Sequence, residues 1–460
     1  MPELRDETMP APCLPVVGAV SAPWRRAGRR TSAVDGAVRR ALVGIVIARL
    51  GVNGGIRVVY PFLAVIAGGL GVSFGVVALL VASRSLAGLA GPAIARATAR
   101  RPRHAMVLSL ALVAAGCAVI ALSTSAPPAG RAVMVGAGFA ATGLARPLFE
   151  LPMQTWVSEH VPRSARGRAL GVSELGWALS LAVTVPVAGV LIERIGWRSP
   201  FLLVALLAVC GAVVLRTTVP EDGPPSRVRT TAARASVASV RPTPVASPRP
   251  TPIASRRAMP VPSPRPSPVV RRRRLTTGWA VCAGAALAVA AGEAVLVVYG
   301  QWLSNVFGLS VARIGMSTLL IVAAELMGEG LVVAVADRVG LCRTLFSAIA
   351  LSLLGYAVLG LVGGRVGTAY TVISAVFVAF EVTVVALIAL ASVTAAHIDD
   401  RRTLLGRLMC AVACGNALGA AVAPVWYAAG GIGLVGKAAA AMAMLALAVL
   451  WLGSGPVDDG

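Results

Sequence analysis

The stretch ALVGIVIARLGVNGGIRVVYPFLAVI, residues 41–66, decides the fold. It is apolar over most of its length, and a helix of about 20 apolar residues crosses the ~30 Å hydrocarbon core of a bilayer. Similar apolar runs recur from about residue 41 to residue 454. The chain is 57% hydrophobic and 13% charged, whereas about a quarter of the residues in a soluble domain are charged. We therefore predict a polytopic, all-α integral membrane protein.

The apolar runs fall into two sets of six, which predict twelve transmembrane helices. Their expected bounds are 41–66, 74–96, 105–124, 132–156, 168–192, 199–216, 278–303, 312–336, 344–363, 367–393, 404–428 and 433–454. Arginines cluster in alternate inter-helix segments, as at Arg100 and Arg101 and again at Arg401 and Arg402. Because short cytoplasmic loops carry an excess of positive residues, this pattern predicts that both termini lie in the cytoplasm. Topology then explains the net charge of +23, and no nucleic-acid partner is expected.

A segment of different composition, residues 217–277, separates the two sets of runs. It is rich in Pro, Ser and Arg, and SPRPTP (247–252) is nearly repeated by SPRPSP (263–268). Because it has few large apolar residues, we expect a disordered cytoplasmic linker; the alternative is a contact with anionic lipid at Arg271–Arg274. The chain is then divided into a disordered cytoplasmic N-terminus (1–40), a six-helix bundle (41–216), the linker (217–277), a second bundle (278–454) and a cytoplasmic tail (455–460).

The two halves repeat each other faintly. VVYPFL (58–63) in the first run of one half corresponds to VVYGQWL (297–303) in the first run of the other. Phe149–Glu150 similarly corresponds to Phe380–Glu381. Repeated halves of a membrane protein typically form two pseudo-symmetric bundles with a binding site between them. We expect that architecture here.

Several motifs resemble those of a known transporter family. GEGLVVAVADRVGLCR (328–343) resembles the loop signature G-x-x-x-D-R-x-G-R-R of the major facilitator superfamily, and HVPRSARGRALG (160–171) resembles the family's loop between helices 4 and 5. FELPMQTW (149–156), with RVVYPFL and VYGQWL, is similar to a prokaryotic, efflux-like subgroup. The resemblance covers about residues 40–454 without the linker. It implies a bacterial plasma (inner) membrane transporter whose bundles alternate in exposing a central site.

The resemblance also implies a gate at the loop signatures. Its residues would be Glu325, Glu329, Asp337, Arg338, Gly340, Arg166 and Arg168. In the first half Ala99 stands where the signature has Asp and Pro102 where it has Gly, so only Asp337 with Arg338 would form the family's latch. The resembled fold places helices 1, 4, 7 and 10 around the central cavity. It places helix 8, which carries Glu325, at the periphery.

Ionisable residues within the predicted spans mark the candidate site, because a charge at mid-bilayer costs about 2.5–3.5 kcal/mol. Arg49, Asn53 and Arg57 are four residues apart and form one slowly drifting stripe along a helix. Such a stripe suits an aqueous cavity between bundles. We predict that substrate binding and proton coupling involve Arg49, Asn53, Arg57, Glu150, Glu293 and Glu381. The alternative is a set of structural ion pairs, for which Arg146 and Glu150, at i and i+4, are the first candidates.

Aromatic residues near these charges have two explanations, a role in the site or an anchoring role. Tyr60, Tyr299 and Trp302 are explained equally well as anchors at the membrane–water interface.

Enzyme classes find little support in the sequence. GIGLVGKA (431–438) matches a P-loop in its glycines and lysine, but Ala438 replaces the magnesium-binding Ser or Thr and no strand precedes it. The three histidines lie in separate loops, and G-x-S-x-G is absent. We predict a monomeric, proton-gradient-driven exporter of a small drug-like compound, metabolite or sugar, with no cofactor and with membrane lipid as its other partner. An uptake permease and a non-transporting sensor on the same scaffold are the alternatives.

Overall fold

The computed structural model describes residues 36–98, 101–161, 165–221, 268–394 and 398–453. Within these ranges all regular secondary structure is helical, with short turns between the helices. The first group of helices comprises α1 (Gly36–Arg57), α2 (Leu63–Leu70), α3 (Phe74–Leu86), α4 (Gly91–Thr98), α5 (Pro102–Leu122), α6 (Pro128–His160), α7 (Arg166–Ile195) and α8 (Ser199–Thr218). The second comprises α10 (Pro268–Phe307), α11 (Val311–Val339), α12 (Leu341–Val358), α13 (Val366–Thr394) and α14 (Ile398–Gly453). Short 3-10 segments are η2 (Tyr60–Phe62), η3 (Ala87–Ala90), η4 (Ser123–Ser125) and η5 (Leu359–Leu361).

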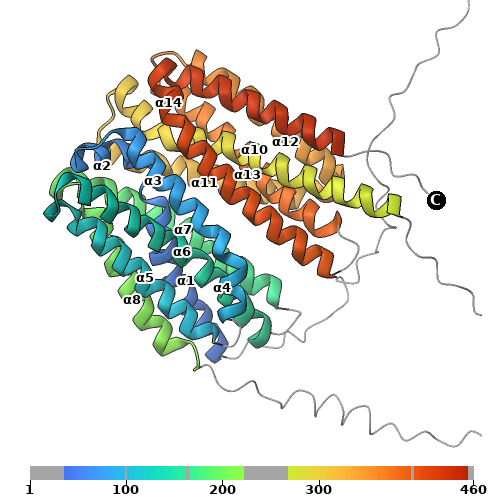
Figure 1. Cartoon of the computed structure of the whole chain (residues 1–460), viewed down its shortest axis with the longest axis horizontal. Coiled ribbons are helices and arrows are strands. Elements are labelled where there is room, and N and C mark those ends of the chain that lie inside the picture. Colours follow the sequence, from blue (N-terminus) through green and yellow to red (C-terminus); the bar gives the residue numbers. More distant parts are fainter. Residues whose placement is uncertain (1–35, 99–100, 162–164, 222–267, 395–397, 454–460) are drawn as a thin grey trace, which may run out of the picture.

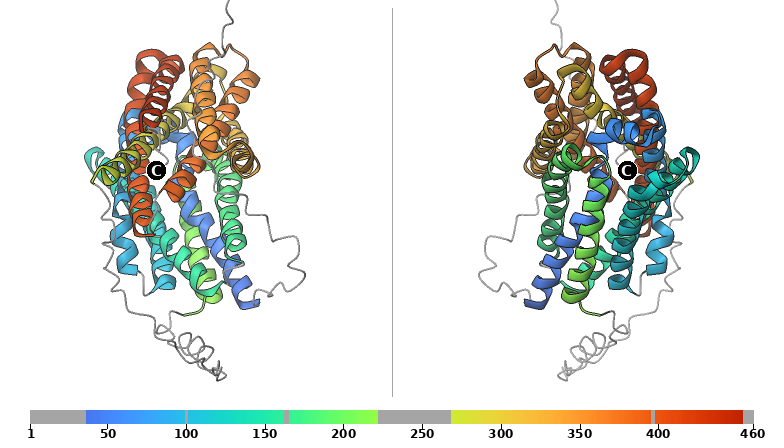
Figure 2. Two further views of the ribbon diagram at one scale, coloured as in Figure 1. Left: turned by 90° about the vertical axis from the view of Figure 1, so that its right-hand side faces the viewer. Right: turned by 90° about the vertical axis from the view of Figure 1, so that its left-hand side faces the viewer.

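The helices α1–α8 lie together in one part of the molecule, and α10–α14 lie together in the other (Figure 1). The two groups meet near α2 and diverge towards α4, so we call these the α2 end and the α4 end. Figure 2 shows the same arrangement from two further sides. The contacts that join the groups are formed chiefly by α7 with α11, by α3 with α14, and by η2 and α2 with α10.

The predicted spans coincide with these helices, while the number of membrane crossings stays a prediction. Ten helical stretches of the described chain are long and apolar enough to cross a membrane. The run at 74–96 is divided into α3, η3 and α4. At 1.5 Å per residue α14 would be about 84 Å long, far more than one crossing requires. Non-helical geometry at Gly430 and Gly431 divides it, and the positive φ of 61° at Gly431 suits a glycine.

The structure corrects two predicted boundaries. Helix α1 begins at Gly36, so the last residues of the segment predicted as a disordered N-terminus are helical. Helix α10 begins at Pro268, so the end of the predicted linker is also helical. Proline suits the first turn of a helix because its missing N–H would be unpaired there, and residues 269–277 contain no further proline. The other parts of these segments (1–35, 222–267) and the tail from residue 454 lie outside the described residues.

Glycines allow the two groups to touch at the α2 end. A Cβ on Gly189 of α7 would lie 3.0 Å from the Val311 carbonyl oxygen and 3.3 Å from Cα of Gly315 on α11. A Cβ on Gly300 of α10 would overlap the carbonyl oxygen of Pro61. Small residues let transmembrane helices approach backbone to backbone. The helix faces at this end are therefore shaped for close contact between the groups.

Candidate functional site

A break after α1 creates the centre of the candidate site. Pro61 lacks a backbone N–H and cannot continue the helical hydrogen bonds, and the chain forms the short segment η2 before α2 begins. Arg57 thus lies at the last turn of α1, and Tyr60 lies in η2 beside α10 of the second group.

Arg57 forms an ion pair that joins the two groups. Its Nη1 lies 3.1 Å from Oε1 of Glu325 on α11, and the two side chains are 16% and 7% exposed. The Arg57 guanidinium also lies over the ring of Trp177 on α7, 4.6 Å from the ring centroid. The resemblance placed Glu325 on a peripheral helix, whereas the structure pairs it with Arg57 between the groups; its part in a gate stays a prediction. Helix α11 presents Glu325 to α1 across the interface between the groups.

A second polar contact between the groups lies one turn away. The Tyr60 hydroxyl donates a hydrogen bond of 2.7 Å to Oε1 of Glu293 on α10, and both side chains are buried. Arg84 of α3 lies over the Tyr60 ring at 5.2 Å and donates a 2.8 Å hydrogen bond to the carbonyl oxygen of Ile56. Glu293, a candidate for proton coupling, thus contacts a tyrosine of the first group.

The three aromatic residues are not interfacial anchors. Tyr60, Tyr299 and Trp302 are all buried. The Tyr299 hydroxyl is 2.9 Å from Oγ1 of Thr318 on α11. They pack inside the protein because the helix faces that carry them are turned towards other helices.

Arg49 and Glu150 lie together within the first group. Nη2 of Arg49 is 3.6 Å from Oε1 of Glu150, and its Nη1 donates a 2.6 Å hydrogen bond to the carbonyl oxygen of Ser173. Nε of Arg146 lies 3.3 Å from the same Oε1, so the predicted i,i+4 pair is present. The Arg146 guanidinium also lies over the Trp177 ring, at 5.0 Å. Trp177 therefore connects the Arg49–Glu150–Arg146 cluster with the Arg57–Glu325 pair.

Glu381 of α13 completes the central group of charges. A Cβ on Gly328 of α11 would lie 2.8 Å from its Cβ, so the two helices are nearly in backbone contact at this level. Within the described chain the Glu381 carboxyl group forms no hydrogen bond or ion pair. Arg57, Glu325 and Glu329 lie within electrostatic reach of it. The structure thus places Glu381 next to the inter-group ion pair.

Asn53 occupies an unusual position between Arg49 and Arg57. Its side chain is fully buried, and neither its amide oxygen nor its amide nitrogen has a hydrogen-bond partner in the described structure. Leaving such a group unpaired costs about 1–3 kcal/mol. The stripe of three residues is therefore real, but its middle member does not meet the charges that its neighbours meet.

The predicted gate residues are spread along the α4 end. Arg338 lies exposed in the last turn of α11, and Gly340, with a φ of 95°, connects α11 to α12. Nε of Arg166 donates a 3.0 Å hydrogen bond to the carbonyl oxygen of Val161, and Glu329 is partly buried on α11. The side chains of Asp337 and Arg168 lie outside the described residues, so the latch that the resemblance implies stays a prediction.

Three residues of the site did not emerge as site residues from the sequence. These are Tyr60, which an anchoring role explains equally well from the sequence, and the residues Arg84 and Trp177. Trp177 lies four residues after Ser173, so the two residues share one helix face. The contact of Ser173 with Arg49 of α1, however, is visible only in the structure.

Comparison with known proteins agrees with this fold. The family model described as Major Facilitator Superfamily matches residues 43–288, which is more than half of the 460 residues. The chain belongs to the major facilitator superfamily. An uncharacterized MFS-type transporter of Salmonella typhimurium (strain LT2) is 38% identical over 96 residues. That match covers 21% of this chain and spans about a quarter, 24%, of the relative.

Solved structures of major facilitator superfamily transporters share the fold. A bacterial homolog of the human lysosomal transporter Spinster, inward-facing and unoccupied, has a TM-score of 0.60 and 12% identity, with 91% of this chain and 96% of that chain covered. A D-xylose–proton symporter has a TM-score of 0.64 and 16% identity, with 90% and 96% covered. A peptide transporter, POT, in complex with alafosfalin has a TM-score of 0.64 and 16% identity, with 90% and 94% covered.

Proposed function

We propose that this chain is a secondary active transporter that exports a small molecule in exchange for protons, by alternating access between its two helix groups. The observation that carries the proposal is the Arg57–Glu325 ion pair, which joins the groups while Glu381 lies beside it. Family membership and the named relatives support transport as the activity. The resemblance of RVVYPFL, VYGQWL and FELPMQTW to efflux-like permeases supports export. We further propose a monomer in a bacterial plasma membrane, with both termini in the cytoplasm.

The charges suggest how a proton and a substrate would compete. Arg57 lies within electrostatic reach of three carboxylates, Glu325, Glu381 and Glu293. A proton that neutralises Glu381 leaves Glu325 as the partner of the guanidinium. Loss of that proton adds a second carboxylate from the same helix group, so the attraction between Arg57 and the second group becomes stronger. Titration at this one place therefore changes how firmly the α2 end is held closed.

The substrate would enter where the site is partly accessible. Arg146, Glu150 and Arg57 have side chains that are 41%, 23% and 16% exposed, whereas Glu293 and Tyr60 are buried deeper towards the α2 end. Both signs of charge and the Trp177 ring are present, which suits an amphiphile with a charged group.

Proteoliposomes test the proposal directly. Vesicles with the purified protein and a trapped pH-sensitive dye are exposed to a panel of cationic, zwitterionic and anionic amphiphiles. Export by antiport predicts that at least one compound releases protons across the membrane only when the protein is present, and that a cell lacking the protein accumulates that compound. Binding without flux would support the sensor, and proton movement in the same direction as the compound would support uptake.

Glycine 189 provides a test of alternating access that needs no substrate. Leucine at this position cannot fit against Val311 and Gly315, so Gly189→Leu is expected to separate α7 from α11 and open the α2 end. Spin labels at the exposed positions 198 and 365, one on each group, should report a longer distance by several ångströms. Gly68→Leu is the matched control, because nothing lies within 4 Å of its Cβ position. An unchanged distance in folded Gly189→Leu protein would contradict the proposed closure.

A further inference from the structure

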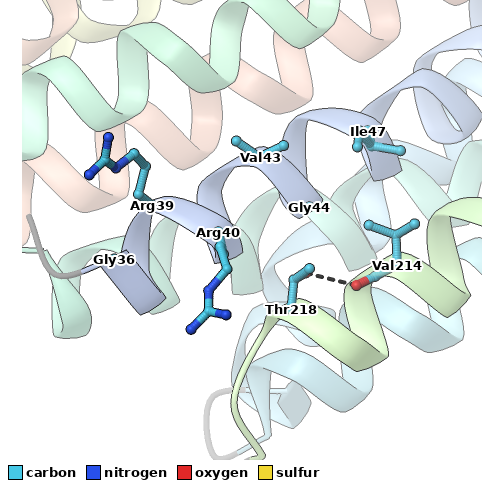
Figure 3. A pocket seen from close by; sticks show the side chains of 8 residues that line it. All are labelled: Gly36, Arg39, Arg40, Val43, Gly44, Ile47, Val214 and Thr218. Carbon is cyan, nitrogen blue, oxygen red and sulfur yellow. Dashed lines mark hydrogen bonds between the residues drawn. The ribbon is translucent and has the colours of Figure 1, made fainter.

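A groove far from the central site runs between the start of α1 and the end of α8 (Figure 3). Its volume is about 530 Å³. It is lined by Gly36, Arg39, Arg40, Val43, Gly44, Ile47, Val214 and Thr218. Val43 and Ile47, one turn apart on α1, are 55% and 37% exposed. The groove is therefore an open, apolar depression on the outside of the first group, at the α4 end.

Two glycines, which have no side chain beyond hydrogen, give the groove its shape. A Cβ on Gly44 would overlap Oγ1 of Thr218, which is held by its 2.7 Å hydrogen bond to the carbonyl oxygen of Val214. The backbone of α1 thus forms the floor where α8 lies against it. At the end of the groove Gly36 has open space at its Cβ position.

The groove lies beside a strongly apolar, exposed face of α8. The outward face of α8 carries large apolar side chains that are more than half exposed, namely Leu202, Leu206, Val209 and Val213. In a family of membrane proteins such a face contacts acyl chains. An acyl chain can therefore reach Val43, Ile47 and Val214 without leaving the apolar phase.

Two arginines lie at one end of this apolar groove. Arg39 and Arg40 are exposed, and neither forms an ion pair with any residue that the structure describes. Their side chains extend on two sides of the start of α1, that of Arg40 alongside Thr218 (Figure 3). Glu221, which follows α8, is bound instead by Arg103 at 3.3 Å. No carboxylate lines the groove among the described residues.

We propose that this groove binds one anionic phospholipid. The phosphate contacts Arg40, Arg39 strengthens the attraction, and one acyl chain lies along Val43, Ile47 and Val214. Guanidinium groups bind phosphate oxygens through paired N–H donors, and the groove supplies the apolar wall that a free phosphate would not need. The groove is separate from the charges between the helix groups. The proposed lipid binding therefore does not depend on which substrate is transported or in which direction.

Native mass spectrometry of the full-length protein in detergent tests the proposal, with phosphatidylglycerol as the probe and phosphatidylcholine as the neutral comparison. An arginine near an anionic headgroup contributes roughly a fivefold gain in binding. Arg40→Gln should therefore weaken retention of phosphatidylglycerol about fivefold, and the double variant R39Q/R40Q about 25-fold. The double variant R343Q/R407Q removes the same charge from exposed positions of the second group and should leave retention unchanged. Equal losses in the two double variants would overturn the proposal in favour of general attraction to a basic surface.

A second variant tests the contribution of the apolar groove independently of the two arginines. Val43→Trp fills the groove but keeps both arginines, so it should reduce phosphatidylglycerol retention as strongly as the loss of Arg40. Phosphatidylglycerol with a photoactivatable acyl chain should label residues 36–47 or 214–218 of the unaltered protein. Full retention by Val43→Trp, or labelling confined to other segments, would overturn the proposed site.

Discussion

Replacing Glu381 with glutamine is expected to abolish proton-driven flux while the protein remains folded and inserted. Glutamine has nearly the same shape as a protonated glutamate but cannot release a proton. Because the Glu381 carboxyl group forms no hydrogen bond or ion pair within the described structure, the substitution removes no contact that holds helices together. The measurement is substrate-dependent proton movement in proteoliposomes with an imposed pH gradient, and a loss of at least 100-fold, which amounts to about 2.7 kcal/mol, is expected.

Two controls test whether the loss of flux is specific to Glu381. Glu221→Gln makes the same chemical change at a side chain that is 91% exposed, and it should leave the flux unaltered. Glu381→Gln protein should still exchange substrate between the two sides without a pH gradient, because binding and alternation do not require the proton carrier. Undiminished pH-driven flux in this variant would remove Glu381 from the coupling mechanism.

The largest effect on stability is expected at the Arg57–Glu325 ion pair. Glu325→Gln leaves the guanidinium without its principal carboxylate in a site that is mostly shielded from water. Breaking a buried ion pair from one side costs about 3–5 kcal/mol, and the nearby Glu381 should reduce this to about 3 kcal/mol. The free energy of unfolding in mixed detergent micelles measures the loss.

The double variant R57Q/E325Q distinguishes the contribution of the ion pair to stability from the separate contributions of its two residues. Because it leaves no unpaired charge at this position, it should recover part of the stability that Glu325→Gln loses. It should also open the α2 end more readily, since the link between the groups is gone, and spin labels at positions 198 and 365 report this. Losses that simply add in the double variant would show that the two residues act independently.

Much of the fold could be predicted because membrane crossing imposes a length and an apolar composition on each helix. The sequence predicted the run at 41–66 and also the separation of the last two runs, at 404–428 and 433–454, which the break at Gly430 and Gly431 produces. Helix ends were less predictable. Residues 268–277 have a composition that suits either a linker or a helix, and only the continuation into α10 makes them helical.

The candidate site could be predicted in part. The spacing of Arg49, Asn53 and Arg57 places them on one helix face whatever surrounds them. Their partners depend on how the two groups meet, and the pair of Arg57 with Glu325 joins residues that are far apart in the sequence. The contact of Tyr60 with Glu293 depends on the break at Pro61, which turns η2 towards α10. Local patterns carry no information about such contacts.

The stacking of Arg57 and Arg146 over Trp177 has an optical consequence. Indole emission responds to nearby charge, so departure of either guanidinium should alter the colour and intensity of the fluorescence from this ring. A variant that keeps Trp177 as its sole tryptophan would carry its own label at the junction of two charge clusters. Stopped-flow recordings of that light would then time the rearrangement of the core without any attached dye.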